Sequence, residues 1–328
     1  MVVDLSRRQY LGLAAGAGLA RAATEADVLE QWEQIATETD GVVGAAALHM
    51  ESGRRASLRG DDRFPMASVC KLPIAVNILA MVGEAKLTLK DKIEIPFQDV
   101  VPGVSEVAER WPKQKIFPLN ELLELMVAKS DNTVVETLFR MGGGGAGMAA
   151  RFRQWKIDGM RVDRSERQCN LDAAGVANIP PVSQWTPGMF DELTAKVQPA
   201  ERLRAMRRFL DDPRDTATPS GTIRFLERAF RGELLSRDLT ARLVEILKAT
   251  STGSGRIKGL LPSGTVVAHK TGTTSTVAGL NGGTNDVGVI MPALAIAIYV
   301  KGSTRNEKTR DRVIARIAKV AFDAWSHA

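Results

Sequence analysis

The chain has 328 residues, 44% of them hydrophobic and 25% charged, a composition typical of a globular protein with one large domain or two modest ones. The net charge is +6, yet aromatic residues make up only 5% and no basic stretch carries interleaved aromatic side chains, so we expect no nucleic-acid partner. Two cysteines and three histidines form no cluster in the sequence that could supply the ligands of a zinc site. We therefore expect neither a metal nor a cofactor.

Residues 1–22 have the pattern of an export signal. Twin arginines, Arg7 and Arg8, precede a weakly apolar run that ends at Ala20, and a small-x-small cleavage pattern follows at Ala22. The run is too short and too rich in alanine and glycine to span a bilayer stably. An amphipathic first helix is the alternative interpretation. We predict export by the twin-arginine route, cleavage near Ala22, and a periplasmic or secreted protein without stable membrane insertion.

The hydrophobic pattern predicts helix and strand at both ends of the chain and helices in the middle. In chain order we expect a helix over 23–38, a strand over 42–50, helices over 119–128 and 133–141, strands over 265–274, 286–291 and 294–300, and a helix over 306–325. The glycine-rich segment 142–147 predicts a flexible turn, since no strand precedes it and no Lys-Ser/Thr pair closes a phosphate-binding loop. One sheet built from both ends of the chain would leave the middle as a helical domain.

A Ser-x-x-Lys motif joins Ser68 to Lys71 ahead of an apolar helical segment. On a helix this spacing brings the lysine amine over the serine hydroxyl, where it can share or remove the hydroxyl proton. Such activation needs no histidine, which agrees with the positions of His49 in an apolar run and His327 at the chain end. Taken alone, however, the motif favours a simpler interpretation, a helix N-cap serine followed by a solvated lysine.

Two further motifs follow in order and change that interpretation. Ser130 begins a Ser-Asp-Asn motif at the end of a predicted helix, and Lys270 begins a Lys-Thr-Gly motif in the predicted strand 265–274. Ser130 supplies a second hydroxyl that can pass a proton to a leaving nitrogen, and Lys270 supplies positive charge near it. Gly272 would let a substrate backbone approach the strand closely. The three motifs occur together in penicillin-recognising serine enzymes.

With these motifs the chain resembles the class A β-lactamases over roughly residues 24–170 and 211–326. The resemblance implies hydrolysis of the β-lactam ring through a serine acyl-enzyme, with antibiotic resistance as the result and a small-molecule β-lactam as the partner of a monomeric protein. It also implies an α/β (α+β) fold, with a five-stranded antiparallel sheet flanked by helices and an all-helical domain. We expect the α/β domain to be discontinuous, over 23–64 and 245–328, with the helical domain over 65–244.

The segment from Arg164 to Asn170 resembles the family's Ω-loop, which carries its deacylating glutamate. By this resemblance Glu166 and Asn170 hold the water that attacks the acyl-enzyme, because a carboxylate can act as general base on a water fixed by a neighbouring amide. Asp215 would pair with Arg164 at the neck of the loop. The implied catalytic residues are Ser68, Lys71, Ser130, Glu166 and Lys270.

The stretch before the third motif resembles the extended-spectrum branch of the family. Arg256 would bind the substrate carboxylate together with the hydroxyls of Thr271 and Thr273, a task that suits a guanidinium. Asn132 would bind the acylamino side chain of the substrate, and the N–H groups of Ser68 and Thr273 would form the oxyanion hole. The implied substrate-binding residues are Asn132, Asn170, Arg256, Thr271, Gly272 and Thr273.

The resemblance has departures around the Ω-loop. An insertion, 171–211, separates the two ends of the loop and is much longer than the segment that the family usually has there. It contains apolar residues at helical spacing with arginines around them. We expect an amphipathic helix with a solvated basic face, with a substrate-contacting lid as the alternative. The loop's end could also be aligned at Trp185, but an alignment near Asp215 preserves more residues. Glu136 replaces the asparagine that usually braces the Ω-loop, which puts that bracing contact in doubt.

Cys70 and Cys169 would both lie near the catalytic water in this fold. An oxidising compartment permits a disulfide between them, and two packed thiols are the alternative. For the activity itself, two other classes remain open. A penicillin-binding DD-peptidase shares the three motifs but lacks the deacylating glutamate, and a β-lactam sensor stays acylated. Glu166 argues against the first of these.

Overall fold

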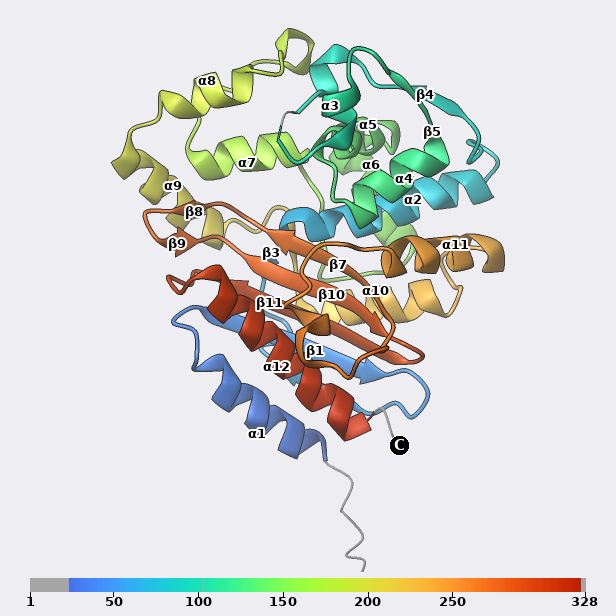
Figure 1. The fold of residues 1–328 in the computed structure, drawn as a ribbon, viewed down its shortest axis with the longest axis vertical. Helices are drawn as coiled ribbons and strands as arrows, with labels where there is room; N and C mark the ends of the chain where they lie inside the picture. The colour runs from blue at the N-terminus through green and yellow to red at the C-terminus, as the bar shows by residue number, and fades with distance from the viewer. Residues whose placement is uncertain (1–23, 102, 326–328) are drawn as a thin grey trace, which may run out of the picture.

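The computed structural model describes residues 24–101 and 103–325. Its centre is a five-stranded antiparallel sheet with the strand order β2–β1–β11–β10–β7, so that both ends of the chain contribute to it (Figure 1). The strands are β1 (Val42–His49), β2 (Arg55–Leu58), β7 (Val267–Thr273), β10 (Thr284–Ile290) and β11 (Leu294–Lys301). The predicted antiparallel sheet is confirmed. The short edge strand β2 was not predicted.

Both faces of the sheet are covered, which explains the nearly continuous apolar run of β11. Ile296 and Ile298 point into one core cluster, while Ala297 and Tyr299 point into another on the opposite face. The first cluster is closed by α1 (Glu25–Ala36) and α12 (Glu307–Trp325), which lie side by side on that face (Figure 1). The opposite face receives α10 (Pro219–Phe230), whose Thr222 hydroxyl bonds the hydroxyl of Tyr299 at 2.8 Å.

The helical part of the molecule is built around α2 (Lys71–Gly83), which follows the nucleophile motif directly. This helix is apolar nearly all round and is buried from Lys71 to Ala80, as expected for a central helix. The helices packed on it are α4 (Leu119–Ala128), α5 (Asn132–Met141), α6 (Gly144–Gln154) and α11 (Arg237–Lys248). The domain boundaries at residues 64/65 and 244/245 stay a prediction.

The prediction of a flexible turn over 142–147 is wrong in its second half, because α6 begins at Gly144. A Cβ on Gly147 would lie 2.1 Å from the carbonyl oxygen of Gly142, and one on Gly145 would lie 2.3 Å from that of Asp163. The glycines therefore serve close packing of this helix start against neighbouring backbone.

The remaining elements of the described residues connect these parts of the fold. They are β3 (Phe64–Pro65), η1 (Ala67–Cys70), β4 (Lys92–Glu94), η2 (Phe97–Asp99), α3 (Glu106–Arg110), β5 (Ile116–Pro118), α7 (Glu166–Ala174), η3 (Val182–Gln184), α8 (Met189–Ala195), α9 (Pro199–Asp211), β6 (Thr216–Ala217), η4 (Ile257–Leu260), β8 (Thr276–Val277) and β9 (Leu280–Asn281). Within the described residues, no helix has the length and apolar character needed to cross a membrane.

The apolar residues of the insertion, 171–211, lie in two small clusters that are separate from the two large core clusters. Its helix α9 buries Met206 and Phe209 in a small apolar cluster, while Arg204 and Arg208 pair with Glu201 on the exposed side. The predicted amphipathic helix with a solvated basic face is therefore confirmed. A second small cluster of Leu171, Val176 and Trp185 holds the first half of the insertion together.

Candidate active site

Ser68 lies in η1, a single turn before α2, and the backbone around it is unusual. Ala67 has a φ of 48°, in a region that non-glycine residues adopt only where the surrounding structure holds them. Strand β7 lies against this turn. A Cβ on Gly272 would come within 2.5 Å of the carbonyl oxygen of Met66 and 3.2 Å of the backbone nitrogen of Ser68. Gly272 is therefore needed for the approach of the protein's own nucleophile turn, and the approach of a substrate backbone to this glycine stays a prediction.

Lys71 is fully buried, and its ammonium contacts three other predicted site residues. It donates to Asn132 Oδ1 at 2.6 Å and to the carbonyl oxygen of Ser130 at 2.7 Å, and it lies 2.9 Å from Glu166 Oε2. The motif predicted that the amine would lie over the hydroxyl of Ser68. Instead, Ser68 Oγ donates to Glu166 Oε1 at 3.1 Å, so that the carboxylate lies between serine and lysine.

Ser130 joins the two buried lysines. Its hydroxyl accepts from Lys270 Nζ at 3.0 Å and from Lys71 Nζ at 3.3 Å. Its φ of 62° is a second left-handed non-glycine conformation, and it occurs beside Asp131, whose carboxylate caps α5 by accepting from the N–H groups of Thr133 and Val134. The Ser-Asp-Asn motif is thus a strained turn fixed by its own helix cap.

Lys270 carries a charge that burial makes costly. Desolvation, followed by repulsion from the nearby ammonium of Lys71, lowers the pKa of Lys270 to about 7. Its Nζ donates to Ser130 Oγ and to the carbonyl oxygen of Thr271. A proton on Lys270 is therefore held weakly near neutral pH, directly beside the hydroxyl that could relay it.

Glu166 opens α7, where Ser165 caps the helix by accepting from the N–H of Gln168. Because Asn170 follows four residues later, both side chains lie on one face of α7, and both line the same cleft. The carboxylate has one oxygen on Ser68 and the other on Lys71. It can therefore exchange protons with either group.

The doubt about the bracing contact at Glu136 is removed by the structure. Glu136 Oε1 accepts from the backbone N–H of Arg167 at 2.8 Å, and Oε2 lies 3.3 Å from its guanidinium. Burial raises the pKa of Glu136, and the charge of Arg167 opposes this shift. Arg167 also donates to the carbonyl oxygen of Gln98 and stacks over Trp185 at 4.5 Å. These contacts hold Arg167, the residue next to Glu166, in place.

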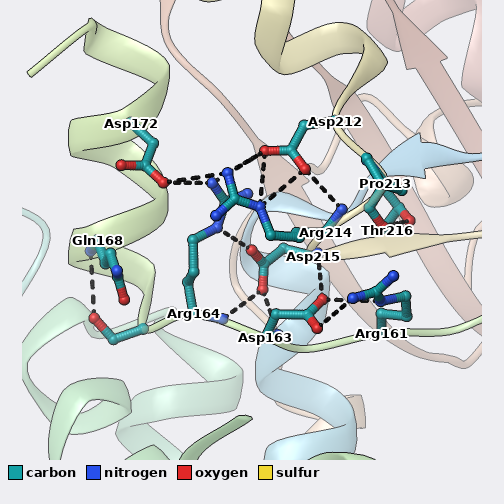
Figure 2. Close-up of polar contacts among 11 residues, drawn as sticks. Arg161, Asp163, Arg164, Gln168, Asp172, Asp212, Pro213, Arg214, Asp215 and Thr216 are labelled. Carbon is teal, nitrogen blue, oxygen red and sulfur yellow. Dashed lines mark hydrogen bonds and ion pairs between the residues drawn. The ribbon is translucent and has the colours of Figure 1, made fainter. Parts of the chain in front are cut away.

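The neck of the Ω-loop is closed by ion pairs around Arg164, as the sequence predicted for its partner Asp215 (Figure 2). Asp215 Oδ2 lies 2.5 Å from Arg164 Nε, and its Oδ1 accepts from the N–H groups of Asp163 and Arg164. Asp172 and Asp212, from either end of the insertion, also pair with the Arg164 guanidinium at 2.6 and 3.2 Å. The insertion therefore returns to the place where it left the loop.

The predicted carboxylate-binding group lies beside the last residue of β7. Arg256 is buried, and its guanidinium donates to Thr273 Oγ1 at 2.7 Å and pairs with Asp311 at 2.7 Å. It also donates to the carbonyl oxygen of Gly272 at 3.1 Å. Thr271 bonds to the hydroxyl of Thr252 at 2.5 Å. Because its nitrogens are already engaged, Arg256 orients the exposed hydroxyl of Thr273 and supplies positive potential rather than an open fork.

One cleft of about 580 Å³ collects these residues. The predicted residues that line it are Ser68, Ser130, Asn132, Glu166, Asn170, Arg256, Thr271, Gly272 and Thr273. Lys71 and Lys270 are fully buried and reach the cleft through Ser130. Sequence reasoning missed further wall residues. These are Val101, Val104, Pro187, Phe190 and Asp191, which no motif marks.

Cys70 and Cys169 also line the cleft, but both are free thiols, so the hypothesised disulfide is not formed in the structure. Burial raises the pKa of both thiols, which keeps them protonated. Cys70 belongs to the main core, and Cys169 packs against the apolar cluster that holds α9. The structure therefore agrees with the alternative prediction, two packed thiols.

Comparison with known proteins agrees with this geometry. Residues 27–325 match the model of the Beta-lactamase enzyme family. The extended-spectrum β-lactamase PER-1 of Pseudomonas aeruginosa is 28% identical over 305 residues, covering 89% of this chain and 85% of that protein. A solved β-lactamase from Chitinophaga pinensis is 30% identical with a TM-score of 0.75, covering 91% of this chain and 99% of that one.

An ancestral class A β-lactamase structure is likewise 30% identical, with a TM-score of 0.73, and it covers 91% of this chain and all of that one (100%). The resemblance that the motifs carried is thereby confirmed. The chain belongs to the β-lactamase enzyme family, in its class A branch, and is a hydrolase that acts on β-lactams.

Proposed function

We propose that Ser68 opens the β-lactam ring and forms an acyl-enzyme, which water then hydrolyses with Glu166 as general base. The observation that carries this proposal is the Glu166 carboxylate, with one oxygen 3.1 Å from Ser68 Oγ and the other 2.9 Å from Lys71 Nζ. In that position it can take the hydroxyl proton of the attacking serine and later a proton of the attacking water. The product, a β-lactam with its ring opened, no longer acts as an antibiotic, which would give resistance.

In the acylation step, Ser68 Oγ forms a bond to the ring carbonyl carbon and the carbon–nitrogen bond of the ring breaks. The hydroxyl proton of Ser68 passes to Glu166, and the leaving nitrogen takes the hydroxyl proton of Ser130. The Lys71 ammonium restores the proton of Ser130 and recovers one from Glu166, which is a carboxylate again at the end of the step. Lys270, which donates to Ser130 Oγ, supports that relay. In deacylation, water gives one proton to Glu166 and its oxygen bonds to the acyl carbon. The bond from that carbon to Ser68 Oγ breaks, and Glu166 returns the proton to Ser68 Oγ.

Sustained turnover separates this proposal from a DD-peptidase and from a sensor. Wild-type protein mixed with excess nitrocefin is expected to hydrolyse many equivalents at a steady rate. A single burst of one equivalent, followed by no further colour change, would instead indicate an enzyme that stays acylated. The Glu166 carboxylate beside Ser68 favours steady turnover, because it supplies the general base that a DD-peptidase lacks.

The pKa of Lys270 predicts the pH dependence of acylation. The cationic form predominates below a pH of about 7 and is lost above it, so kcat/KM, which reports the free enzyme, is expected to fall on the alkaline side. Lys270→Arg keeps the positive charge at any accessible pH, and we expect its alkaline limb to move upward by at least one pH unit. Profiles of benzylpenicillin hydrolysis measure this shift, and identical limbs would contradict the role of the Lys270 charge.

Export by the twin-arginine route, cleavage near Ala22 and a monomeric state stay predictions of the sequence. Residues 1–23 lie outside the described part of the chain. We propose that the enzyme acts in the periplasm or is secreted, because the twin arginines, the apolar run and the cleavage pattern stand in the order of an export signal.

A further inference from the structure

A buried histidine and a buried aspartate lie behind strand β7. His269 and Asp286 are both fully buried, and His269 Nδ1 lies 2.8 and 3.0 Å from the two carboxylate oxygens of Asp286. In the register of β7 and β10, Thr271 pairs with Asp286 and Lys270 pairs with Val287. Because side chains alternate along a strand, the histidine and the aspartate point to the face of the sheet that η4 and α12 cover, and the side chain of Lys270 points to the opposite face.

The carboxylate of Asp286 is held by a second donor, which belongs to the segment around Arg256. Asp286 Oδ2 accepts from the N–H of Ile257, the residue after Arg256, at 3.1 Å. The carbonyl oxygen of His269 accepts from the hydroxyl of Thr250 at 2.6 Å. The histidine and the aspartate therefore also tie the chain on either side of Arg256 to β7 and β10.

These contacts favour a negative charge on Asp286 and a neutral ring on His269. Nε2 of His269 is buried and has no hydrogen-bond partner among the described residues, so an imidazolium would leave a buried N–H unpaired. The neutral tautomer with its proton on Nδ1 donates to Asp286 and leaves no N–H unpaired. No ion pair joins this carboxylate to a cation of η4 or α12 within the described residues, which include the buried or half-buried Arg256, Lys258 and Arg310. Asp286 therefore carries a buried charge that has no cation of its own.

The charge of Asp286 acts on Lys270 through the sheet. The charged or titratable groups that face this ammonium are Lys71 of α2, Glu166 of α7, Cys70 of η1 and Asp286 of β10. On α11, which also packs against β7, the buried residues are all apolar. Burial and the charge of Lys71 lower the pKa of Lys270 to about 7, and the two carboxylates oppose this shift. Glu166 loses its charge when it takes the proton of Ser68, whereas Asp286 lies behind the strand and keeps its charge.

We propose that Asp286, held in place by His269, is the buried counter-charge that keeps Lys270 cationic during acylation. It is a positioning residue that acts through Lys270, and this role rests on the proposed function. Asp286→Asn removes the charge and keeps the contacts. The amide oxygen still accepts from Ile257, and the amide nitrogen can donate to the other neutral tautomer of His269.

Asp286→Asn is expected to move the alkaline limb of kcat/KM for benzylpenicillin to lower pH by about one unit. The direction follows because loss of a negative charge weakens the hold of Lys270 on its proton, so that the cation is lost at a lower pH. His269→Leu removes the donor that favours the charged carboxylate, and it should move the limb in the same direction. In a Lys270→Arg background, whose cation does not titrate in this range, Asp286→Asn should leave the limb in place. Asp99→Asn is the matched control, because Asp99 is also buried but pairs with Arg140 on α5.

The titration of Lys270 can also be followed without substrate. NMR of protein with isotope-labelled lysine would show its signal, identified by its absence from Lys270→Arg, and the midpoint should fall in Asp286→Asn. A limb and a midpoint that coincide with those of the wild type would overturn the counter-charge while the proposed function stands. An equal shift in Asp99→Asn, or a shift that persists in the Lys270→Arg background, would overturn it as well. A wild type that turns over no penicillin would overturn the proposed function, and the NMR midpoints would still decide whether Asp286 holds the charge of Lys270.

Discussion

Glu166→Gln is expected to accept one equivalent of benzylpenicillin and then stop as an acyl-enzyme. The glutamine keeps the size of the side chain but cannot take a proton from water, so deacylation should fall by about 10²- to 10⁴-fold, the usual range for a general base. Rapid-quench kinetics with mass spectrometry would measure the accumulated adduct. The carboxylate also contacts Ser68, and we therefore expect slower acylation as well, but to a smaller extent because Lys71 remains.

Glu201→Gln is a suitable control, because Glu201 pairs with arginines on the exposed side of α9, away from the cleft. It should leave both steps unchanged. Steady turnover by Glu166→Gln at a rate close to that of the wild type would contradict the assignment of Glu166 as the base.

Lys71→Ala is expected to slow acylation about as strongly as Glu166→Gln slows deacylation. The fully buried ammonium contacts Glu166, Ser130 and Asn132, and its loss removes both a proton carrier and the charge that holds the Glu166 carboxylate in place. Acylation should slow by about 10²- to 10⁴-fold. The unfolding free energy should fall by about 1–3 kcal/mol, because buried acceptors lose their donor.

The acylation rate from stopped-flow nitrocefin assays and the midpoint of urea unfolding measure the two effects. Lys86→Ala removes an exposed lysine near the end of α2 and should change neither rate nor stability appreciably. Lys71→Arg should not restore acylation, since the larger, planar guanidinium does not fit the contacts of a buried ammonium. An acylation rate of Lys71→Ala within ten-fold of the wild type would contradict a role for Lys71 in proton transfer.

The parts of the fold that sequence could predict are those with strong patterns. The apolar run of β11 and the periodic pattern of α12 give both elements nearly to the residue. The edge strand β2 has four residues and no clear alternation, so no local pattern distinguishes it from a turn. The glycines at 144–147 favour a turn locally, but packing against Gly142 and Asp163 makes them the start of a helix.

The candidate site, like the fold, could be predicted only in part. The three motifs identify residues whose chemical types are distinctive, and the structure collects them in one cleft. Which residue contacts which could not be predicted from spacing. Glu166 lies between Ser68 and Lys71 because α7 is held against α5, through Glu136 and Arg167. That bracing pair brings together distant parts of the chain, and neither residue belongs to the three catalytic motifs.

The wall formed by α8 could not be predicted for a related reason. Phe190 and Asp191 have ordinary types for a surface helix, and only the folding of the insertion back to Arg164 brings them to the cleft. Their position at the cleft depends on long-range ion pairs, which a short segment of sequence does not reveal. A sequence pattern can indicate such a helix, but not the surface that it covers.

The most direct test of the account is the location of the covalent adduct. Glu166→Gln incubated with benzylpenicillin and digested with a protease is expected to yield a single modified peptide, heavier by the mass of the intact penicillin and carrying it on Ser68. The same treatment of Ser68→Ala should yield no adduct. An adduct on another residue, or none in Glu166→Gln although the wild type hydrolyses penicillin, would contradict the assignment of Ser68 as the nucleophile.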